Sequence, residues 1–154
     1  MLQLTSQKLS RIKAETLIVP VCEDQILFHD KAMRKLAESV RTIKTFTARP
    51  GEYLSRYQPD GIGVERVIFA GLGLSRDLTR ERLRQAAGQS IRRAWHAQAG
   101  NAVVAVPDAH LPEPTDFSQV FEALTEGAYL ANHTFPANKL EHRSVPVKHI
   151  WLVV

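Results

Sequence analysis

The sequence has a single cysteine, no long apolar run and no signal-peptide pattern, and each absence excludes a class of protein. With Cys22 alone, the chain of 154 residues cannot form an internal disulfide, which excludes the small secreted folds that disulfides stabilise. No apolar run approaches the roughly 20 residues that cross a bilayer, so we expect no membrane-spanning helix. The first residues lack the basic start and long apolar stretch of a signal peptide. Together these features predict a cytoplasmic protein.

Recognisable catalytic motifs are also missing. No glycine-rich loop leads into Gly-Lys-Ser/Thr, and no serine or cysteine stands in a Gly-x-Ser-x-Gly turn. The six histidines form no His-Glu-x-x-His motif and no Cys/His pair at zinc-binding spacing. Glu23, Asp24 and His29 could hold a cation, but a solvated acidic turn is the favoured interpretation. The sequence therefore assigns no catalytic, cofactor-binding or metal-binding residue.

The charge is weakly positive, and much of it lies on one predicted helix. Lysine and arginine number 20 against 16 acidic residues, a net charge of +4 that is too small to argue for a partner by itself. Five arginines lie off the apolar stripe of the helix predicted over residues 79–98: Arg80, Arg82, Arg84, Arg92 and Arg93. Such a face could contact nucleic-acid phosphates, but the solvated side of an amphipathic helix is the favoured interpretation.

Four short apolar runs rich in β-branched residues predict buried strands. They occupy residues 17–22, 67–73, 102–106 and 150–154. Cys22 ends the first run, where we expect a small buried side chain and not a reactive thiol. Weaker runs predict two flanking strands, an edge strand over residues 2–6 and a second over residues 42–48. Residues 50–63 and 107–114 are predicted to be irregular.

Three segments between these runs carry apolar residues at helical spacing. They are residues 29–40, 79–98 and 115–132, with Thr79 predicted to cap the second and Thr115 or Asp116 the third. Gly127 lies inside the third helix, where it predicts either close packing against a neighbour or the sheet, or a kink. The alternation of strands and helices predicts one α/β domain over residues 1–154, a three-layer αβα fold with a mixed, mostly parallel sheet.

The loop GLGLS (residues 71–75) joins a predicted strand to a predicted helix, as a dinucleotide-binding turn does. The full fingerprint requires a third glycine at the position where this chain has Arg76. The loop is therefore interpreted as a tight turn.

The last eight residues, 147–154, predict a strand that is buried on both faces, since both of its alternating sets of side chains are apolar. Chains usually end in polar surface tails. We therefore expect the sequence to be part of a longer protein.

Several segments, in this order, resemble the N-terminal domain of the leucyl aminopeptidase (cytosol aminopeptidase) family. They are residues 15–24 (ETLIVPVCED), 66–73 (RVIFAGLG), 78–88 (LTRERLRQAAG) and 126–139 (EGAYLANHTFPANK). The family pattern is fitted by Glu126, Gly127, Ala128, Leu130, Phe135 and Lys139. Asn132 and His133 depart from it, because the family has an aromatic residue before Phe135.

The resemblance implies a macro-domain-like fold with a non-catalytic role in assembly or regulation. It also implies a catalytic metallopeptidase domain downstream, absent from this chain, whose two divalent metal ions (Zn or Mn) release N-terminal residues from peptides. The domain would pack against its own catalytic domain within a homo-oligomer, a hexamer, and would be inactive alone.

Two alternatives stay open. One is a free-standing macro-like module that binds a nucleotide or ADP-ribose, although the acidic residues within 21–28 would repel a diphosphate. The other is contact with nucleic acid through the helix that carries Arg80 and Arg93.

Overall fold

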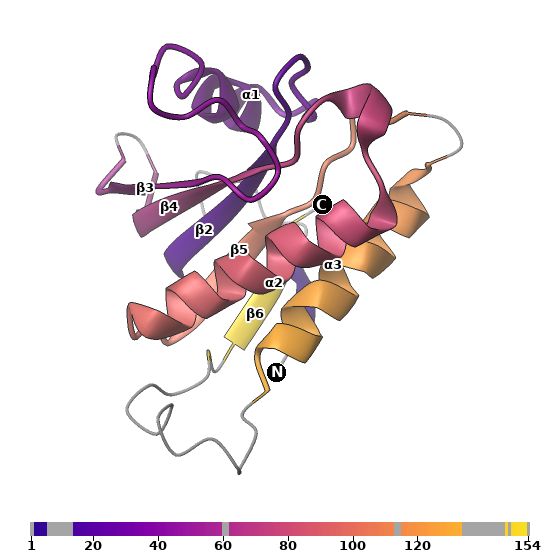
Figure 1. Ribbon diagram of the computed structural model, residues 1–154. Coiled ribbons are helices and arrows are strands. Elements are labelled where there is room, and N and C mark those ends of the chain that lie inside the picture. The colour runs from indigo at the N-terminus through magenta and orange to yellow at the C-terminus, as the bar shows by residue number, and fades with distance from the viewer. Residues whose placement is uncertain are drawn as a thin grey trace.

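The computed structural model describes residues 2–5, 14–59, 62–112, 115–133, 147 and 149–153, and their strands form one six-stranded sheet. Its order is β1-β6-β5-β2-β4-β3 (Figure 1). The strands are β1 (Leu2–Thr5), β2 (Ala14–Val21), β3 (Tyr53–Tyr57), β4 (Val64–Gly71), β5 (Asn101–Ala105) and β6 (His149–Val153). Every neighbouring pair is parallel except β3 and β4, which are antiparallel. The predicted mixed, mostly parallel sheet is confirmed.

The helices cover both faces of this sheet. They are α1 (Lys31–Glu38), α2 (Arg80–His96) and α3 (Phe117–Ala131), with a single 3₁₀ turn, η2 (Ser75–Asp77), before α2. The chain moves one way along the sheet from β2 through α1 to β4, and the other way from β4 through α2 to β5 and through α3 to β6. Right-handed crossovers therefore place α1 on one face and the packed pair α2 and α3 on the other (Figure 1). The predicted three-layer α/β arrangement is confirmed.

Strand β2 lies at the centre of the core. Leu17, Ile18 and Val19 are completely buried, and Ile18 is paired with Ile68 on β4 and Val104 on β5. A strand covered on both faces gains from apolar side chains at every position, which explains the unbroken run in the sequence. β6 lies between β1 and β5, inside the sheet as its apolar pattern predicts, and β1 forms the predicted edge.

The prediction for residues 42–48 is wrong, because this segment forms turns and irregular structure. Phe46 and Ala48 are buried as loop anchors, and Ala48 has a φ of 59°, which reverses the chain where a strand would stay extended. The missing strand is β3, inside the stretch 50–63 that was predicted to be irregular. β3 is an edge strand with mostly exposed or half-buried side chains, so it lacks the apolar pattern that marks the central strands.

Both predicted helix caps are present. The side chain of Thr79 accepts a hydrogen bond from the backbone N–H of Arg82 at 3.2 Å. Asp116 caps α3 in a reciprocal box with Gln119, in which each side chain accepts from the backbone N–H of the other residue. These bonds satisfy backbone donors that the first helical turn leaves free.

Close packing of α2 against α3 explains Gly127. A Cβ atom at this position would overlap the backbone carbonyl of Arg84 on α2. A Cβ on Gly88, which faces the same crossing, would lie 3.3 Å from the carbonyl oxygen of Gly127. The glycine therefore permits two backbones to touch, which confirms packing against a neighbour as the reason for it.

Asn132, one of the residues that departs from the family pattern, fixes the approach to β6. Its side-chain amide donates to the carbonyl of Val147 at 2.7 Å and its Oδ1 accepts from the N–H of Val147 at 2.9 Å. No periodic pattern in the sequence predicts these bonds between residues 15 positions apart.

In the part of the chain that the structure describes, no helix has the length and apolar character needed to cross a membrane.

Candidate functional site

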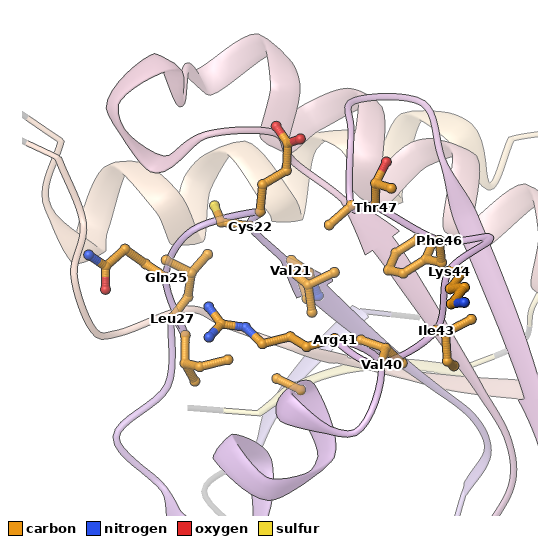
Figure 2. Close-up of a pocket in the computed structure, with 15 residues that line it drawn as sticks. Val21, Cys22, Gln25, Leu27, Val40, Arg41, Ile43, Lys44, Phe46 and Thr47 are labelled. Carbon is orange, nitrogen blue, oxygen red and sulfur yellow. The ribbon is translucent and has the colours of Figure 1, made fainter.

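A cavity of about 270 Å³ opens where the chain leaves β2 at the carboxyl edge of the sheet (Figure 2). It lies between residues 20–27 on one side and the end of α1 with residues 40–48 on the other. Beside it the connections diverge, since β2 continues toward β4 and the adjacent β5 continues toward β6. Ligands of open α/β sheets bind at such reversals, so the cavity is the candidate binding site of this chain.

The cavity combines an apolar wall with a few polar groups. The apolar wall includes the buried side chains of Val21, Leu27, Val40 and Phe46. The polar side chains that line it are Glu23, Gln25, Arg41, Lys44 and Thr47. Figure 2 shows the Arg41 side chain extended across the cavity, with its guanidinium toward the side where Gln25 and Leu27 lie. Residues 21–28 were considered in the sequence only as a nucleotide-binding stretch, and the other half of the lining, from the irregular segment 40–48, carries no pattern that marks a site.

Cys22 lies on the cavity wall and is buried. Burial, with a further contribution from Asp24 and Glu23, raises the pKa of its thiol from 9.0 to about 12. The thiol is therefore neutral near pH 7 and behaves as a small apolar side chain, as predicted.

The acidic turn after β2 fastens a loop and does not assemble a cation site. The two carboxylate oxygens of Asp24 accept from the backbone N–H and the hydroxyl of Ser75, both at 2.8 Å. Partial burial raises the pKa of Asp24, but the bonds from Ser75 and the nearby charge of Arg41 outweigh it and lower the pKa below its ordinary value. His29 is held elsewhere, since its backbone N–H donates to Asp108 at 2.9 Å. Within the described ranges, no group of three or more His, Cys, Asp or Glu residues could hold a metal ion.

The GLGLS loop is the tight turn that the sequence predicted. Gly73 has a φ of 83°, a left-handed conformation that favours glycine. Its N–H donates to the carbonyl of Ala48 at 2.8 Å, and its carbonyl accepts from the N–H of Glu23 at 2.9 Å. Ala48 and Glu23 line opposite sides of the cavity, so this turn holds the two walls together.

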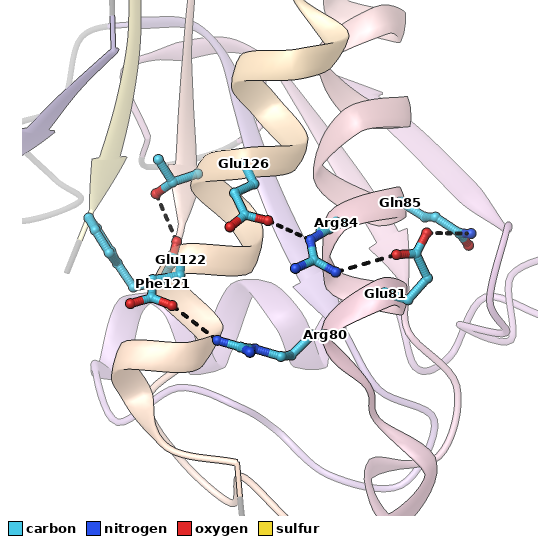
Figure 3. A network of polar contacts seen from close by, with 8 residues as sticks. Arg80, Glu81, Arg84, Gln85, Phe121, Glu122 and Glu126 are labelled. Carbon is cyan, nitrogen blue, oxygen red and sulfur yellow. Dashed lines mark hydrogen bonds and ion pairs between the residues drawn. The ribbon is translucent and has the colours of Figure 1, made fainter.

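The arginines at the start of α2 are paired with glutamates of α3 (Figure 3). Arg80 bonds Glu122 at 3.0 Å, and Arg84 bonds Glu126 at 2.6 Å. Arg84 also lies 3.5 Å from Glu81 on its own helix. The hydrogen bond and charge of Glu126 raise the pKa of Arg84 above its ordinary value.

The other three arginines of this helix also contact groups of the same chain. Arg82 donates to the carbonyl of Leu72 at 3.4 Å, and the guanidinium of Arg93 lies 4.4 Å from the centre of the Tyr53 ring. Arg92 lies 5.6 Å from the ring of Trp95. This supports the interpretation of the helix as an internally satisfied amphipathic element, while contact with nucleic acid stays an untested prediction.

One buried arginine was missed. Arg66 on β4 is only 8% exposed, donates to the hydroxyl of Thr16 at 3.2 Å and lies 5.9 Å from the ring of Tyr57. Its pairing with Thr16 in the first part of β2 places it away from the cavity, which opens at the other end of that strand. It is therefore not part of the candidate site.

Comparison with known proteins gives a consistent result for family and fold. The model of the cytosol aminopeptidase family, N-terminal domain, matches residues 18–141. A probable cytosol aminopeptidase of Sulfurihydrogenibium sp. is 24% identical over 151 residues, which are 92% of this chain and 29% of that protein. A probable cytosol aminopeptidase of Geobacter sp. (strain M21) is 30% identical over 110 residues, 71% of this chain and 20% of that protein.

Solved structures share the fold at low sequence identity. A mutant of tomato leucine aminopeptidase has a TM-score of 0.70 at 14% identity, over 99% of this chain and 32% of that one. The macrodomain of Mycobacterium tuberculosis DarG has a TM-score of 0.62 at 12% identity, over 100% of this chain and 98% of that one. The chain thus spans between a fifth and a third of the aminopeptidases that it matches. On the family match, the chain belongs to the cytosol aminopeptidase family and carries its N-terminal domain.

Proposed function

We propose that this chain is the non-catalytic assembly and regulatory domain of a metal-dependent leucyl aminopeptidase, a hydrolase that releases N-terminal residues from peptides. The observation that carries the proposal is the family match over residues 18–141, together with the shared fold of a leucine aminopeptidase. The proposal takes the parent protein to be cytoplasmic and to assemble as a homohexamer. Its peptide substrate is bound outside this chain.

The proposal assigns the two metal ions, zinc or manganese, to the part of the family that this chain does not span. The described residues do not fit a dinuclear centre, because they gather no group of three metal-binding side chains. Such ions supply Lewis acidity and an activated water for peptide hydrolysis. In this account the domain contributes packing surfaces and the β2 cavity, and takes no part in the bond cleavage.

The direct test is a peptidase assay on the purified 154-residue chain, with leucine p-nitroanilide and a leucyl peptide in the presence of Mn²⁺ or Zn²⁺. We expect no release of p-nitroaniline or leucine above the blank. Release of leucine by a longer polypeptide, which extends this chain to the length of its relatives, would support the proposal.

A matched control variant shows whether any release comes from a contaminating peptidase. The Gly127→Ala variant, which forces α2 and α3 apart, is assayed after the same purification. Release that a chelator abolishes, and that disappears with the fold in urea at a lower concentration for the variant than for the native chain, would contradict the non-catalytic role.

A second candidate is a free-standing nucleotide-binding or ADP-ribose-binding module. It is favoured by the nearly complete mutual coverage of this chain and the DarG macrodomain, 100% and 98%. The acidic residues Glu23 and Asp24 beside the cavity oppose the binding of a diphosphate. Calorimetry with ADP-ribose separates the candidates: we expect no heat of binding, and a saturable heat would favour the module.

A further inference from the structure

We propose that the β2 cavity binds a small organic monocarboxylate with a branched aliphatic body. This ligand class follows from three properties of the cavity: its size, its apolar wall, and the single guanidinium that extends across it. The inference concerns this chain alone and does not depend on the aminopeptidase activity proposed above.

The size and wall of the cavity select a compact apolar body. Its volume of about 270 Å³ equals that of roughly nine water molecules at ~30 Å³ each. Val21, Leu27, Val40 and Phe46 are all at least nine-tenths buried, so their apolar surfaces form a permanent wall. Such a wall gains most from a branched aliphatic group, which buries apolar area at little cost in conformational freedom.

The positive charge of the cavity lining favours a ligand with an anionic head group. Among the described residues, no group hydrogen-bonds to the guanidinium of Arg41, which has five N–H donors in a fork that fits a carboxylate. The amide of Gln25 lies on the side of the cavity toward which this guanidinium points (Figure 2). Lys44 adds a second positive charge to the lining. Arg41 and Gln25 place the carboxylate on their side of the cavity, across from Val40 and Phe46, whereas Lys44 lies on the far side beside Ile43 (Figure 2).

The neighbouring acids limit the charge that the site accepts. Glu23 lines the cavity, and the Asp24 carboxylate interacts electrostatically with Arg41 from the same turn. Asp24 stays ionised, because its bonds from Ser75 lower its pKa. Two fixed negative charges near one or two cations disfavour a diphosphate, whereas a single carboxylate can pair with Arg41.

The test is a titration of the ¹⁵N-labelled 154-residue chain with isocaproate, followed by two-dimensional NMR. We expect saturable shifts for amides that line the cavity, including those of Cys22 and Thr47, with a dissociation constant on the order of 1 mM or tighter. Isocaproamide has the same shape without the charge, and we expect it to bind at least about tenfold more weakly.

Two variants test the role of the guanidinium. Arg41→Gln should weaken isocaproate binding about tenfold or more, and because Arg41 is exposed the variant should keep the native spectrum. Arg34→Gln removes the same charge from an exposed site on α1 outside the cavity and should leave binding unchanged.

Three results would overturn the proposal. They are the absence of saturation by isocaproate, equal affinity for the neutral amide, and shifts centred outside the cavity. None of them depends on peptidase activity, so this proposal and the proposed function can fail separately.

Discussion

The two faces of the sheet differ in how their side chains are used. On the face covered by α2 and α3, the helix backbones touch at Gly127 and arginines of one helix are paired with glutamates of the other. On the face covered by α1, one eight-residue helix and two loops leave a cavity in which Arg41 has no hydrogen-bond partner among the described residues. The charged groups of the first face hold the two helices together, whereas on the second face the guanidinium of Arg41 is available to a ligand.

The two faces also differ in the length of their covering elements. α2 and α3 have 17 and 15 residues and pack along each other, and the arginines that line the cavity beside α2, Arg82 and Arg93, contact Leu72 and Tyr53 of the same chain. α1 has only eight residues, and part of the carboxyl end of β2 is covered by loops instead. Loops complete that cover, held by the bonds of Gly73 to Ala48 and Glu23. Loops fixed by a rigid scaffold are the usual place for binding groups.

Adding one methyl group to a residue on each face should give the largest difference in unfolding free energy between the two faces. Gly127→Ala places a Cβ on the Arg84 carbonyl and forces the helices apart, which should lower the free energy of unfolding by about 2–3 kcal/mol. Val40→Ile adds a methyl group at the cavity wall, where space exists, and should change it by less than about 1 kcal/mol. Urea titrations of both variants measure the contrast.

Gly88→Ala is the control for the helix crossing. Its Cβ would lie 3.3 Å from Gly127 O, a contact that a small shift relieves, and alanine favours a helix by about 1 kcal/mol over glycine. We expect little net change. A loss as large as that of Gly127→Ala would mean that the crossing tolerates no added atom, and the contact at Gly127 would not be special.

The pH dependence of stability should reveal the apolar character of the cavity wall. The pKa of Cys22 is raised to about 12 in the folded chain, so the folded state keeps a proton that the unfolded state loses above its ordinary pKa of 9.0. The neutral thiol therefore contributes its full stability below about pH 9, and this contribution is lost as the pH rises from about 9 to 12.

Comparison with Cys22→Ala isolates this effect. Between about pH 8 and about pH 10, the native chain should lose more unfolding free energy than the variant, which has no thiol to titrate. Parallel losses in urea titrations would show that Cys22 titrates normally and that the wall is more accessible to water than the structure indicates.

The smallest effect is expected for the ion pairs on the α2 and α3 face. A double-mutant cycle with Arg84→Gln and Glu126→Gln should give a weak favourable coupling that disappears at about 1 M salt, because both side chains are partly solvated. Arg84→Gln combined with Glu38→Gln, on α1, should be additive. A strong, salt-independent coupling would contradict the surface character of this pair.

The sequence predicted the elements of this fold better than its site. Apolar runs located β2, β4, β5 and β6, and capping residues located the start of α2 and α3, because burial on both faces and unpaired N–H groups leave local patterns. The cavity left no such pattern, since residues 40–48 are positioned by distant backbone bonds such as that of Ala48 to Gly73.

The ion pairs could have been inferred from spacing. Arg80 and Arg84 lie four residues apart on α2, and Glu122 and Glu126 lie four residues apart on α3. In each ion pair, Arg80 with Glu122 and Arg84 with Glu126, the two residues are 42 positions apart in the chain. This constant separation is expected when two helices pack with matching faces. Without these glutamates, the arginines of α2 are compatible with a nucleic-acid surface, which is why that alternative stayed open at the level of sequence.

The most direct test of the contrast between the two faces is amide hydrogen exchange, resolved by residue, with and without isocaproate. We expect the amides of α2 and α3 to exchange slowly and not to respond to the ligand, whereas the amides of residues 41–49 should exchange faster and slow by about tenfold or more at saturation. Equal slowing on both faces, or no change in residues 41–49, would contradict it.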